Sequence, residues 1–385
     1  MAHQFDTNPR YAEFFAGGGM VSAALRDNWS CALANDVDPM KCATFRANWP
    51  DGNLIEGDIR DLPISALYQP IDLYWASSPC QDFSLAGAGA GLQGKRSSVV
   101  TPWLDLVESA VHTGFSPKII AFENVVGMLS RDKGTALWEV LRRIIRCGYR
   151  VGALNINAQL FVPQSRPRIF VIAVRNDIEV SPDMLSGSPV LPWHDKPIMR
   201  FVERGSARLR QNWLWWNLPL PTKSVPELSG FIEAAPTSAW FSQSQTRAIL
   251  QMMDDKNLEK VHAANKAGKV MVGTLYKRGR PGIDGTTRQR AEVRFDGIAG
   301  CLRTPAGGSS RQTLVFVDGQ KVRMRLLDAR EALSLMGLPR DYIAPQRYND
   351  AYKVAGDGVV VPVVEHLDRH LFRPLVVPHF AAVAA

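Results

Sequence analysis

The sequence predicts an α/β protein with a doubly wound, mixed but mostly parallel sheet of about seven strands, together with a second, smaller domain. Apolar runs alternate with helical stretches from residue 11 to residue 174, and this alternation stops after Arg175. Such alternation is typical of a mostly parallel sheet, because parallel neighbours need a crossover helix. A chain of 385 residues is also long enough for one large domain and a smaller one.

The expected strands are short apolar runs bounded by turn residues. They cover residues 11–15, 31–35, 54–59, 71–76, 118–122, 150–156 and 169–174. Prolines mark both boundaries of an expected helix that begins at Pro39 and stops before Pro50. A later expected helix carries Leu137 and Leu141 on one face and ends at Gly148.

The chain changes character beyond residue 178. Four prolines lie between residues 182 and 197 in a short Ser/Gly-containing stretch, which predicts a linker. We therefore expect a large domain over residues 1–178, completed by residues 346–385, and a second domain over residues 185–345.

The chain is basic, with a formal net charge of +8 and a pI of about 9.3. Between Lys266 and Arg311 there are ten Lys or Arg residues against three acids. A solvated surface would explain this run, and a second small core would explain the tryptophans at positions 193, 213, 215, 216 and 240. A basic, glycine-rich domain that carries aromatic residues nevertheless suits nucleic acid better than a small metabolite.

Several classes of protein are disfavoured. No apolar stretch approaches the ~18 residues of a membrane span, and the N-terminal residues lack a basic-then-apolar signal segment. The five cysteines have no paired metal spacing, and their odd number argues against a disulfide framework. His366 and His370 are four residues apart and predict a solvated helix rather than a metal site. We expect a cytoplasmic protein with no metal site and no membrane partner.

Cys80 is the most informative residue. It follows Pro79 at the end of the apolar run 71–77, so a strand leads to a thiol at the carboxyl edge of the sheet, where open α/β sheets bind ligands. Pro79 restricts Ser78 and fixes its own φ, which makes the turn rigid. A lone free cysteine is also commonly a small buried hydrophobe, so Cys80 alone leaves both interpretations open.

A glycine-rich turn predicts a nucleotide-like cofactor. Phe15-Ala16-Gly17-Gly18-Gly19 follows the first strand and opens a helix, and backbone without side chains can approach a ligand there. Ser22 stands where a dinucleotide fingerprint has its third glycine. Asp36 and Asp58 end the next two strands, where they either cap turns or bind a ribose and an adenine amine. Three successive strand ends of this kind favour an adenosyl pocket.

Polar residues also follow one later strand and precede the last one. Glu123 and Asn124 follow the buried run 118–122; Glu123 needs a partner or its pKa rises, and a structural interpretation has Asn124 cap the next helix. In Gln164-Ser165-Arg166-Pro167-Arg168, the two arginines alternate with small residues and are predicted to share a face. Fixed donors of this kind suit a base carbonyl or phosphates.

In this order the motifs resemble those of DNA cytosine-C5 methyltransferases of the bacterial restriction-modification type. The matching segments are 15–19, Asn35-Asp36-Val37-Asp38, Asp58-Ile59, Pro79-Cys80-Gln81, Glu123-Asn124-Val125, 164–168, Arg330-Glu331-Ala332 with Met336-Gly337-Leu338-Pro339, and 352–362. The resemblance covers about residues 1–175 and 300–370, and the residues between carry no motif, as expected of the family's variable target-recognition region.

Three positions depart from the family pattern. Met20 stands where the family usually has a second glycine, and Asp36 stands where it often has a glutamate, although Asp36 keeps the charge. Gly356-Asp357-Gly358-Val359 replaces the family's usual Gly-Asn-Ser-Val.

The resemblance implies the S-adenosylmethionine-dependent methyltransferase fold, S-adenosylmethionine as cofactor, and a target-recognition domain that binds double-stranded DNA. It implies no obligatory protein partner, and a cognate restriction endonuclease encoded nearby is a candidate partner. The implied catalytic residues are Cys80, Glu123, Arg166 and Arg168. The implied cofactor-binding residues are Phe15, Ala16, Gly17, Gly19, Asp36, Val37, Asp58, Ile59, Pro79, Asp357 and Val359. The implied substrate-binding residues are Ser78, Gln81, Ser84, Asn124 and Gln164.

The chemistry of these residues agrees with that implication. Carbon 5 of cytosine is a poor nucleophile, and a thiolate that adds to carbon 6 activates it. The base must leave the duplex stack for this reaction. The Gly/Ala-rich stretch 82–98, which contains Lys95 and Arg96, is expected to form a mobile loop that closes over the flipped base.

Three other functions share part of the pattern. An RNA cytosine methyltransferase would use the same catalytic set, but the long basic insert favours duplex DNA. A nicotinamide-dependent oxidoreductase would not need Cys80, Glu123 and an arginine pair together. A catalytically inactive DNA-binding homologue is disfavoured because every catalytic position is filled.

Overall fold

The computed structural model describes residues 8–79, 99–281, 286–305 and 311–377. Contacts divide the chain into two compact units. The first unit consists of Met1–Asn157, Pro167–Pro221 and Val361–Ala385, and the second of Ala158–Arg166 and Thr222–Val360. Residues 185–221 therefore lie in the first unit and residues 346–360 in the second, whereas the sequence placed both domain boundaries elsewhere.

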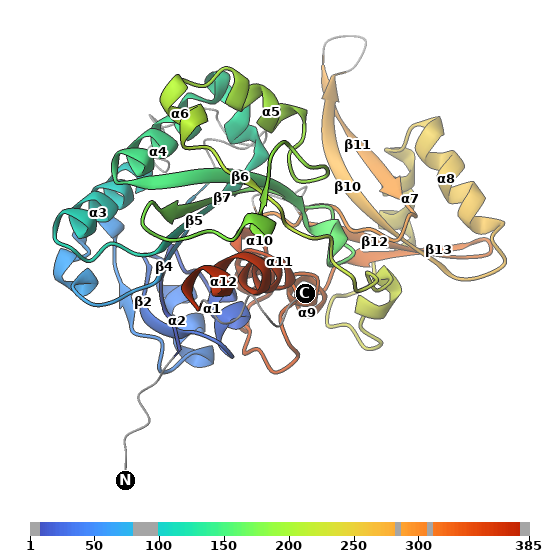
Figure 1. The fold of residues 1–385 in the computed structure, drawn as a ribbon. Helices are drawn as coiled ribbons and strands as arrows, with labels where there is room; N and C mark the ends of the chain where they lie inside the picture. Colours follow the sequence, from blue (N-terminus) through green and yellow to red (C-terminus); the bar gives the residue numbers. More distant parts are fainter. Residues whose placement is uncertain (1–7, 80–98, 282–285, 306–310, 378–385) are drawn as a thin grey trace. The chain divides into compact units, whose positions relative to one another are not determined.

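The first unit contains a seven-stranded sheet with the strand order β3-β2-β1-β4-β5-β7-β6 (Figure 1). The strands are β1 (Arg10–Phe14), β2 (Ser30–Asp36), β3 (Leu54–Glu56), β4 (Leu73–Ser77), β5 (Ile119–Val125), β6 (Tyr149–Asn157) and β7 (Pro167–Arg175). The first five strands pair in parallel, and β7 pairs antiparallel with both β5 and β6. The predicted doubly wound, mixed but mostly parallel sheet is confirmed.

The strand order reverses between β1 and β4. The chain runs outward from β1 through β2 to β3, and then returns to place β4 and β5 on the other side of β1. Ligands of open α/β sheets bind outside the carboxyl ends of the strands at such a reversal. Phe14, Asp36, Ser77 and Val125 end parallel strands and therefore lie along that one edge.

Helices cover both faces of this sheet (Figure 1). Side chains alternate along β4, so Tyr74 and Ala76 share a core with α3 (Val100–His112) and α4 (Thr135–Arg146). Trp75 points to the opposite face, where its ring centroid lies 6.1 Å from that of Phe372. The helices α1 (Met20–Leu25), α2 (Pro39–Asn48), α11 (Val361–Leu367) and α12 (Arg373–Val376) complete the unit with α5 (Lys196–Glu203) and α6 (Ala207–Gln211).

The predicted linker is wrong, because this proline-rich stretch is folded. β8 (Leu185–Ser186) pairs with β9 (Trp215–Trp216), and Asp195 caps the first turn of α5. Trp193 is 1% exposed and donates from Nε1 to the Leu218 carbonyl over 2.6 Å. Prolines here mark irregular but packed backbone, and buried indole rings hold it in place. The tryptophans at positions 193, 213, 215 and 216 accordingly belong to the first unit and not to a second small core.

The second unit contains a four-stranded antiparallel sheet with the order β11-β10-β12-β13. Its strands are β10 (Met271–Pro281), β11 (Thr287–Arg294), β12 (Thr313–Asp318) and β13 (Lys321–Leu326), and its helices are α7 (Gln243–Gln251), α8 (Asp255–Asn265), α9 (Ala329–Ser334) and α10 (Tyr348–Asp357). Val315, Val317 and Met324 point to the face that packs on α7 and α8. The predicted smaller second domain is therefore present.

A search of the helices in the described part of the chain found none that is long and apolar enough to span a membrane.

Candidate active site

Ser78 and Asn124 connect the ends of β4 and β5. The Asn124 Nδ2 donates to Ser78 Oγ over 2.9 Å, and both side chains are buried. Asn124 Oδ1 accepts from the Val125 amide over 2.8 Å, so the carboxamide orders the strand end rather than capping a helix. The Asn124–Ser78 bond fixes Ser78 in place. Ser78 is followed by Pro79, the last described residue before Cys80.

The predicted nucleophile is outside the described residues. Cys80, Gln81, Ser84 and the expected loop 82–98 all fall in the undescribed segment 80–98. Their roles stay predictions that rest on the sequence and on the position of Pro79.

Glu123 and Arg168 form an ion pair at the same edge of the sheet. Glu123 is opposite Ser77 across β4 and β5, and Arg168 is opposite Val125 across β5 and β7. Arg168 Nε lies 3.1 Å from Glu123 Oε1, and the two side chains are only 13% and 10% exposed. A carboxylate and a guanidinium thus stand next to the strand end that precedes Cys80, and together they offer an anionic acceptor and a fork of donors.

Arg166 and Gln164 belong to the second unit and have internal partners. The Arg166 guanidinium donates to the carbonyls of Leu302, Gly356 and Gly358 over 2.9, 3.0 and 2.7 Å. The Gln164 Nε2 donates to the Leu335 carbonyl over 2.9 Å, and its Oε1 accepts from the Leu302 amide over 3.2 Å. The alternation argument for the two arginines does not apply, because β7 begins only at Pro167. Direct contact of Arg166 or Gln164 with a base stays a prediction.

The glycine-rich turn after β1 has an unusual backbone. Phe15 adopts a φ of 61°, and Gly17 and Gly19 have φ values of 57° and 77°. A positive φ is rare for a residue with a side chain and is typical of functional turns. The Ala16 amide donates to the Asn35 carbonyl over 2.9 Å, which fixes the turn to the end of β2.

Asp36 connects this turn to the start of α2. Its Oδ2 accepts from the Gly17 amide and its Oδ1 from the Asp38 amide, each over 2.8 Å. Each carboxylate oxygen has a further lone pair that suits a ribose hydroxyl. Val37 beside it is 62% exposed and offers an apolar contact. A fixed carboxylate, an exposed apolar side chain and a tight glycine turn fit an adenosyl group, so the residues of the first unit suit the expected cofactor.

Asp58 caps a short helix, which is one of the two roles that the sequence left open, the other being contact with an adenine amine. Its carboxylate accepts from the Arg60 amide over 2.9 Å and from Arg60 Nη2 over 2.7 Å. These hydrogen bonds from Arg60 lower the pKa of Asp58 below its usual value. Ile59 is buried in the core beside it. An adenine contact at Asp58-Ile59 stays a prediction.

Asp357 and Val359 lie in the second unit. The Thr304 hydroxyl donates to the Asp357 carboxylate, and Val359 is buried. Gly356 packs so closely that a Cβ there would be 2.5 Å from the Thr304 amide. Asp357, which departs from the family pattern, thus has Thr304 as a hydrogen-bond partner inside this unit. The cofactor role of Asp357 and Val359 stays a prediction.

The sequence interpretation missed two residues that hold the cofactor turn. Glu13, within β1, is 2% exposed and accepts from Ser22 Oγ over 2.8 Å, and burial raises its pKa to about 8. An acid inside an apolar strand was a readable signal for this residue. Trp49 packs against Gly19, and no local pattern marks that contact because the two residues are thirty positions apart in the chain.

Gly19→Ala is predicted to destabilise the fold and to weaken cofactor binding. A Cβ at this position would lie 2.2 Å from Trp49 Nε1, and the φ of 77° disfavours any side chain. We expect a loss of about 2–5 kcal/mol, from about 1–2 for the left-handed backbone and about 1–3 for overpacking. The matched control is Gly17→Ala, where the nearest contact is 4.0 Å away and only the backbone term applies. Thermal unfolding and calorimetric titration with S-adenosylmethionine measure both effects, and equal losses in the two variants would contradict this account.

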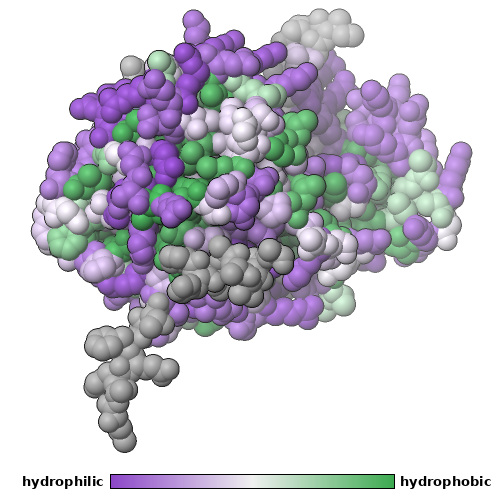
Figure 2. All heavy atoms as spheres, viewed as in Figure 1, coloured by the Kyte–Doolittle hydropathy of each residue, from purple (hydrophilic) through white to green (hydrophobic). Residues whose placement is uncertain are grey.

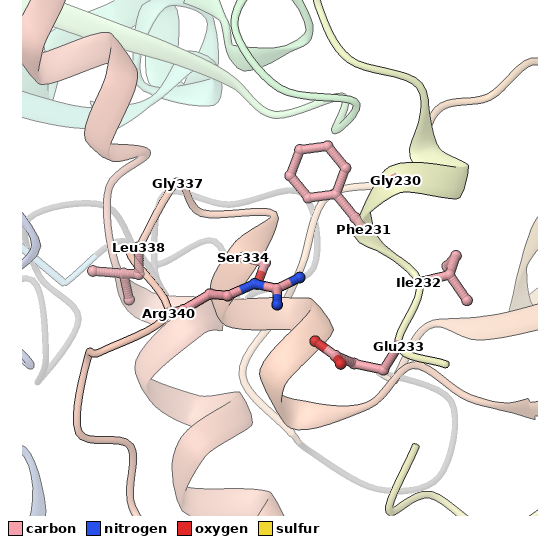
Figure 3. A pocket seen from close by; sticks show the side chains of 8 residues that line it. All are labelled: Gly230, Phe231, Ile232, Glu233, Ser334, Gly337, Leu338 and Arg340. Atoms are coloured by element: carbon pink, nitrogen blue, oxygen red, sulfur yellow. The ribbon is translucent and has the colours of Figure 1, made fainter. Parts of the chain in front are cut away.

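A pocket of about 310 Å³ lies elsewhere in the second unit. It is lined by Gly230, Phe231, Ile232, Glu233, Ser334, Gly337, Leu338 and Arg340. Figure 3 shows the Arg340 and Glu233 side chains extending toward one another across it. All its lining residues are described, and none of them is a predicted catalytic or cofactor-binding residue.

Comparisons with known proteins show the family of this chain. Residues 10–373 match the model of the family described as C-5 cytosine-specific DNA methylase. The Type II methyltransferase M.NgoPII of Neisseria gonorrhoeae is 26% identical over 92% of this chain and 93% of its own length. The Type II methyltransferase M.PspPI of Psychrobacter sp. is 32% identical over 43% of this chain, and that match spans only 39% of the relative's length.

Solved structures share the fold. The crystal structure of the S. pombe Dnmt2 methyltransferase superposes with a TM-score of 0.63 and 17% identity, over 96% of this chain and 100% of that chain. The family match spans nearly all of the sequence and includes both sheets. The chain therefore belongs to the C-5 cytosine-specific DNA methylase family.

Proposed function

We propose that this protein transfers a methyl group from S-adenosylmethionine to carbon 5 of a cytosine flipped out of duplex DNA, in a restriction-modification or epigenetic marking role. The observation that carries the proposal is the Glu123–Arg168 ion pair, which lies beside the Ser78–Asn124 bond at the strand end that leads to Cys80. With Cys80 as the nucleophile, the anionic acceptor and the guanidinium beside this strand end would supply the groups that addition to a pyrimidine requires.

Cys80 would act as the nucleophile. Its thiolate adds to carbon 6, and the new S–C bond takes the electron pair of the thiolate. The electron pair of the 5,6 double bond then forms a double bond between carbons 4 and 5 while ring nitrogen 3 takes up a proton from solvent, and the resulting enamine makes carbon 5 nucleophilic. S-Adenosylmethionine, when bound, supplies an electrophilic methyl group, and its sulfur keeps the electron pair of the S–CH3 bond that breaks. After carbon 5 carries the methyl group, its proton leaves to a base, the double bond re-forms and the S–C bond to Cys80 breaks.

Glu123 and Arg168 would bind the Watson–Crick edge of the base. A carboxylate accepts from the protonated ring nitrogen and from the exocyclic amine, and the contact strengthens as charge develops in the ring. Arg168, held by Glu123, would donate to the base carbonyl through its guanidinium. Both groups are shielded from water, which increases the strength of these contacts.

The cofactor would bind in the first unit at the turn 15–19 and at Asp36. A reduced thiol at Cys80 requires a reducing compartment, so we propose that the protein acts in the cytoplasm. If the role is restriction-modification, we propose a cognate restriction endonuclease as the partner.

Methyl incorporation tests the proposal. The full chain is incubated with labelled S-adenosylmethionine and either plasmid DNA from an unmethylated host or total RNA, and the digested nucleosides are identified by mass spectrometry. We expect 5-methylcytosine in DNA, and sequencing of the methylated plasmid then gives the recognised site. Label in RNA alone would favour the RNA methyltransferase, and label on adenine or on the cytosine amine would contradict the chemistry proposed for Cys80.

A further inference from the structure

The distal half of β10 and β11 is a two-stranded ribbon. β10 pairs with β12 only from Met271 to Leu275, whereas its pairing with β11 continues from Thr274 to Pro281. In the described residues, 276–281 and 287–292 thus pair only with each other, and they project beyond the rest of their sheet (Figure 1). We call these two segments the arginine ribbon.

The arginine ribbon has like charges directly opposite one another. Arg278 is paired with Arg290, and Arg280 with Arg288, and all four side chains are exposed. Because positions two apart on a strand share a face, the four arginines occupy one face of the ribbon. Like charges opposite one another destabilise a sheet, and a two-stranded ribbon alone is already marginal. Glu292 pairs with Arg278 and Arg280 but does not remove the facing of like charges, so folding stability alone gives little reason for this arrangement, whereas a polyanionic partner would.

The base of the ribbon is firmly held. Tyr276 is 8% exposed and donates from its hydroxyl to the Cys301 carbonyl over 2.7 Å, and the Ala291 amide donates to the Met252 carbonyl over 3.1 Å. Glu292 moderates the charge, since its carboxylate lies 3.4 Å from Arg278 Nε and 2.6 Å from Arg280 Nε. Figure 2 shows that the projecting part of β10 and β11 is hydrophilic. The four cations are thus carried on an arm whose root is anchored in the second unit.

We propose that the arginine ribbon binds the phosphate backbone of the duplex, an inference that rests on the proposed function. Four cations crowded on one face need closely spaced negative charges, which phosphates supply and the dipolar edges of bases do not. The ribbon therefore contributes affinity and salt dependence but no sequence discrimination. Lys277, which is opposite Ala291, points to the other face of β10 and takes no part in this contact.

The test is the salt dependence of duplex binding by the double variant Arg278→Gln/Arg290→Gln. Each lost phosphate contact lowers the slope of log Kd against log salt concentration by about 1, so we expect a fall of about 2. The ratio of affinities for a cognate duplex and one with a changed base pair should stay the same. Glu292→Gln should do the opposite and steepen the slope, because it releases Arg278 and Arg280 from their acid.

Two controls separate this contact from a general charge effect. Arg142→Gln/Arg146→Gln removes the same charge from exposed positions of α4 in the first unit, and Lys277→Gln removes one charge from the other face of the ribbon. Per charge removed, neither control should lower the slope by as much as the Arg278→Gln/Arg290→Gln variant. The inference would be overturned by an unchanged slope in the Arg278→Gln/Arg290→Gln variant or by an equal fall in the α4 control. It would also be overturned if the ratio of affinities for the cognate and the changed duplex collapsed, because the ribbon would then read bases.

A methylation assay on the same preparations separates failure of this inference from failure of the proposed function. Wild-type methylation of duplex DNA is measured in parallel, so a ribbon that fails its test in an active enzyme overturns the ribbon alone. A wild-type protein that methylates no DNA would overturn the proposed function instead. Thermal unfolding should show no loss of stability in the double variant, because it relieves a like-charge contact and Glu292 keeps its ion pair with Arg280.

Discussion

Replacing Cys80 by serine is expected to lower the rate of methyl transfer by about 10³-fold or more and to leave duplex binding unchanged. A serine hydroxyl is scarcely ionised at neutral pH and adds poorly to carbon 6, whereas it nearly preserves the size of the side chain. Single-turnover incorporation of labelled methyl groups, with duplex affinity measured on the same preparation, tests this expectation.

The other cysteines of the described chain provide the control. Burial raises the pKa of Cys42 to about 12 and that of Cys147 to about 11, so both thiols are protonated at neutral pH and are poor nucleophiles. Cys147→Ser should therefore retain nearly full activity. A Cys80→Ser enzyme within tenfold of wild type would contradict covalent addition by Cys80.

Glu123→Gln is expected to slow the chemical step by about 10²–10⁴-fold with little change in cofactor affinity. Arg168 Nε lies 3.1 Å from Glu123 Oε1, and the amide oxygen of glutamine can still accept from it. Glutamine lacks the negative charge, however, and so loses the attraction that strengthens as the ring becomes protonated. The cofactor turn at the ends of β1 and β2 is not altered, so binding of S-adenosylmethionine should persist. Single-turnover rates at saturating DNA and calorimetric titration measure the two effects separately.

A structural role for Glu123 makes a different prediction. Arg168 would be left without its full counter-charge, and removing one partner of a buried ion pair is strongly destabilising. The melting temperature of Glu123→Gln is therefore measured beside that of Glu139→Gln, which removes an exposed carboxylate 2.7 Å from Arg142. If activity fell only in proportion to the unfolded fraction, Glu123 would be a structural residue and not a catalytic one.

The strands and their polar ends were predictable because each is a local pattern. An acid at or near the end of a buried strand, as at Asp36 or Glu123, is visible as an apolar run followed by an acid, and parallel pairing brings such ends to one edge. The Ser78–Asn124 bond was not predictable, since it depends on which strands become neighbours. The sequence likewise contains no signal for the antiparallel position of β7 between β5 and β6.

Long-range packing explains where the sequence interpretation was wrong or incomplete. The proline-rich segment has the composition of a linker, but Trp193 is buried through a contact with Leu218 that composition does not encode. Arg166 looked like a partner of Arg168 because they are two residues apart. Its bonds to Gly356 and Gly358 join residues about 190 positions away, which no local pattern reveals.

Covalent trapping on modified DNA tests the central claim most directly. If Cys80 adds to carbon 6 and a proton must then leave carbon 5, fluorine at carbon 5 prevents the final elimination. Duplex DNA with 5-fluorocytosine at the recognised site should therefore capture the protein only when S-adenosylmethionine is present. The adduct should survive denaturing electrophoresis and map by mass spectrometry to the peptide that contains Cys80. An active enzyme that forms no adduct, or forms one at Cys31, Cys42, Cys147 or Cys301, would contradict the account.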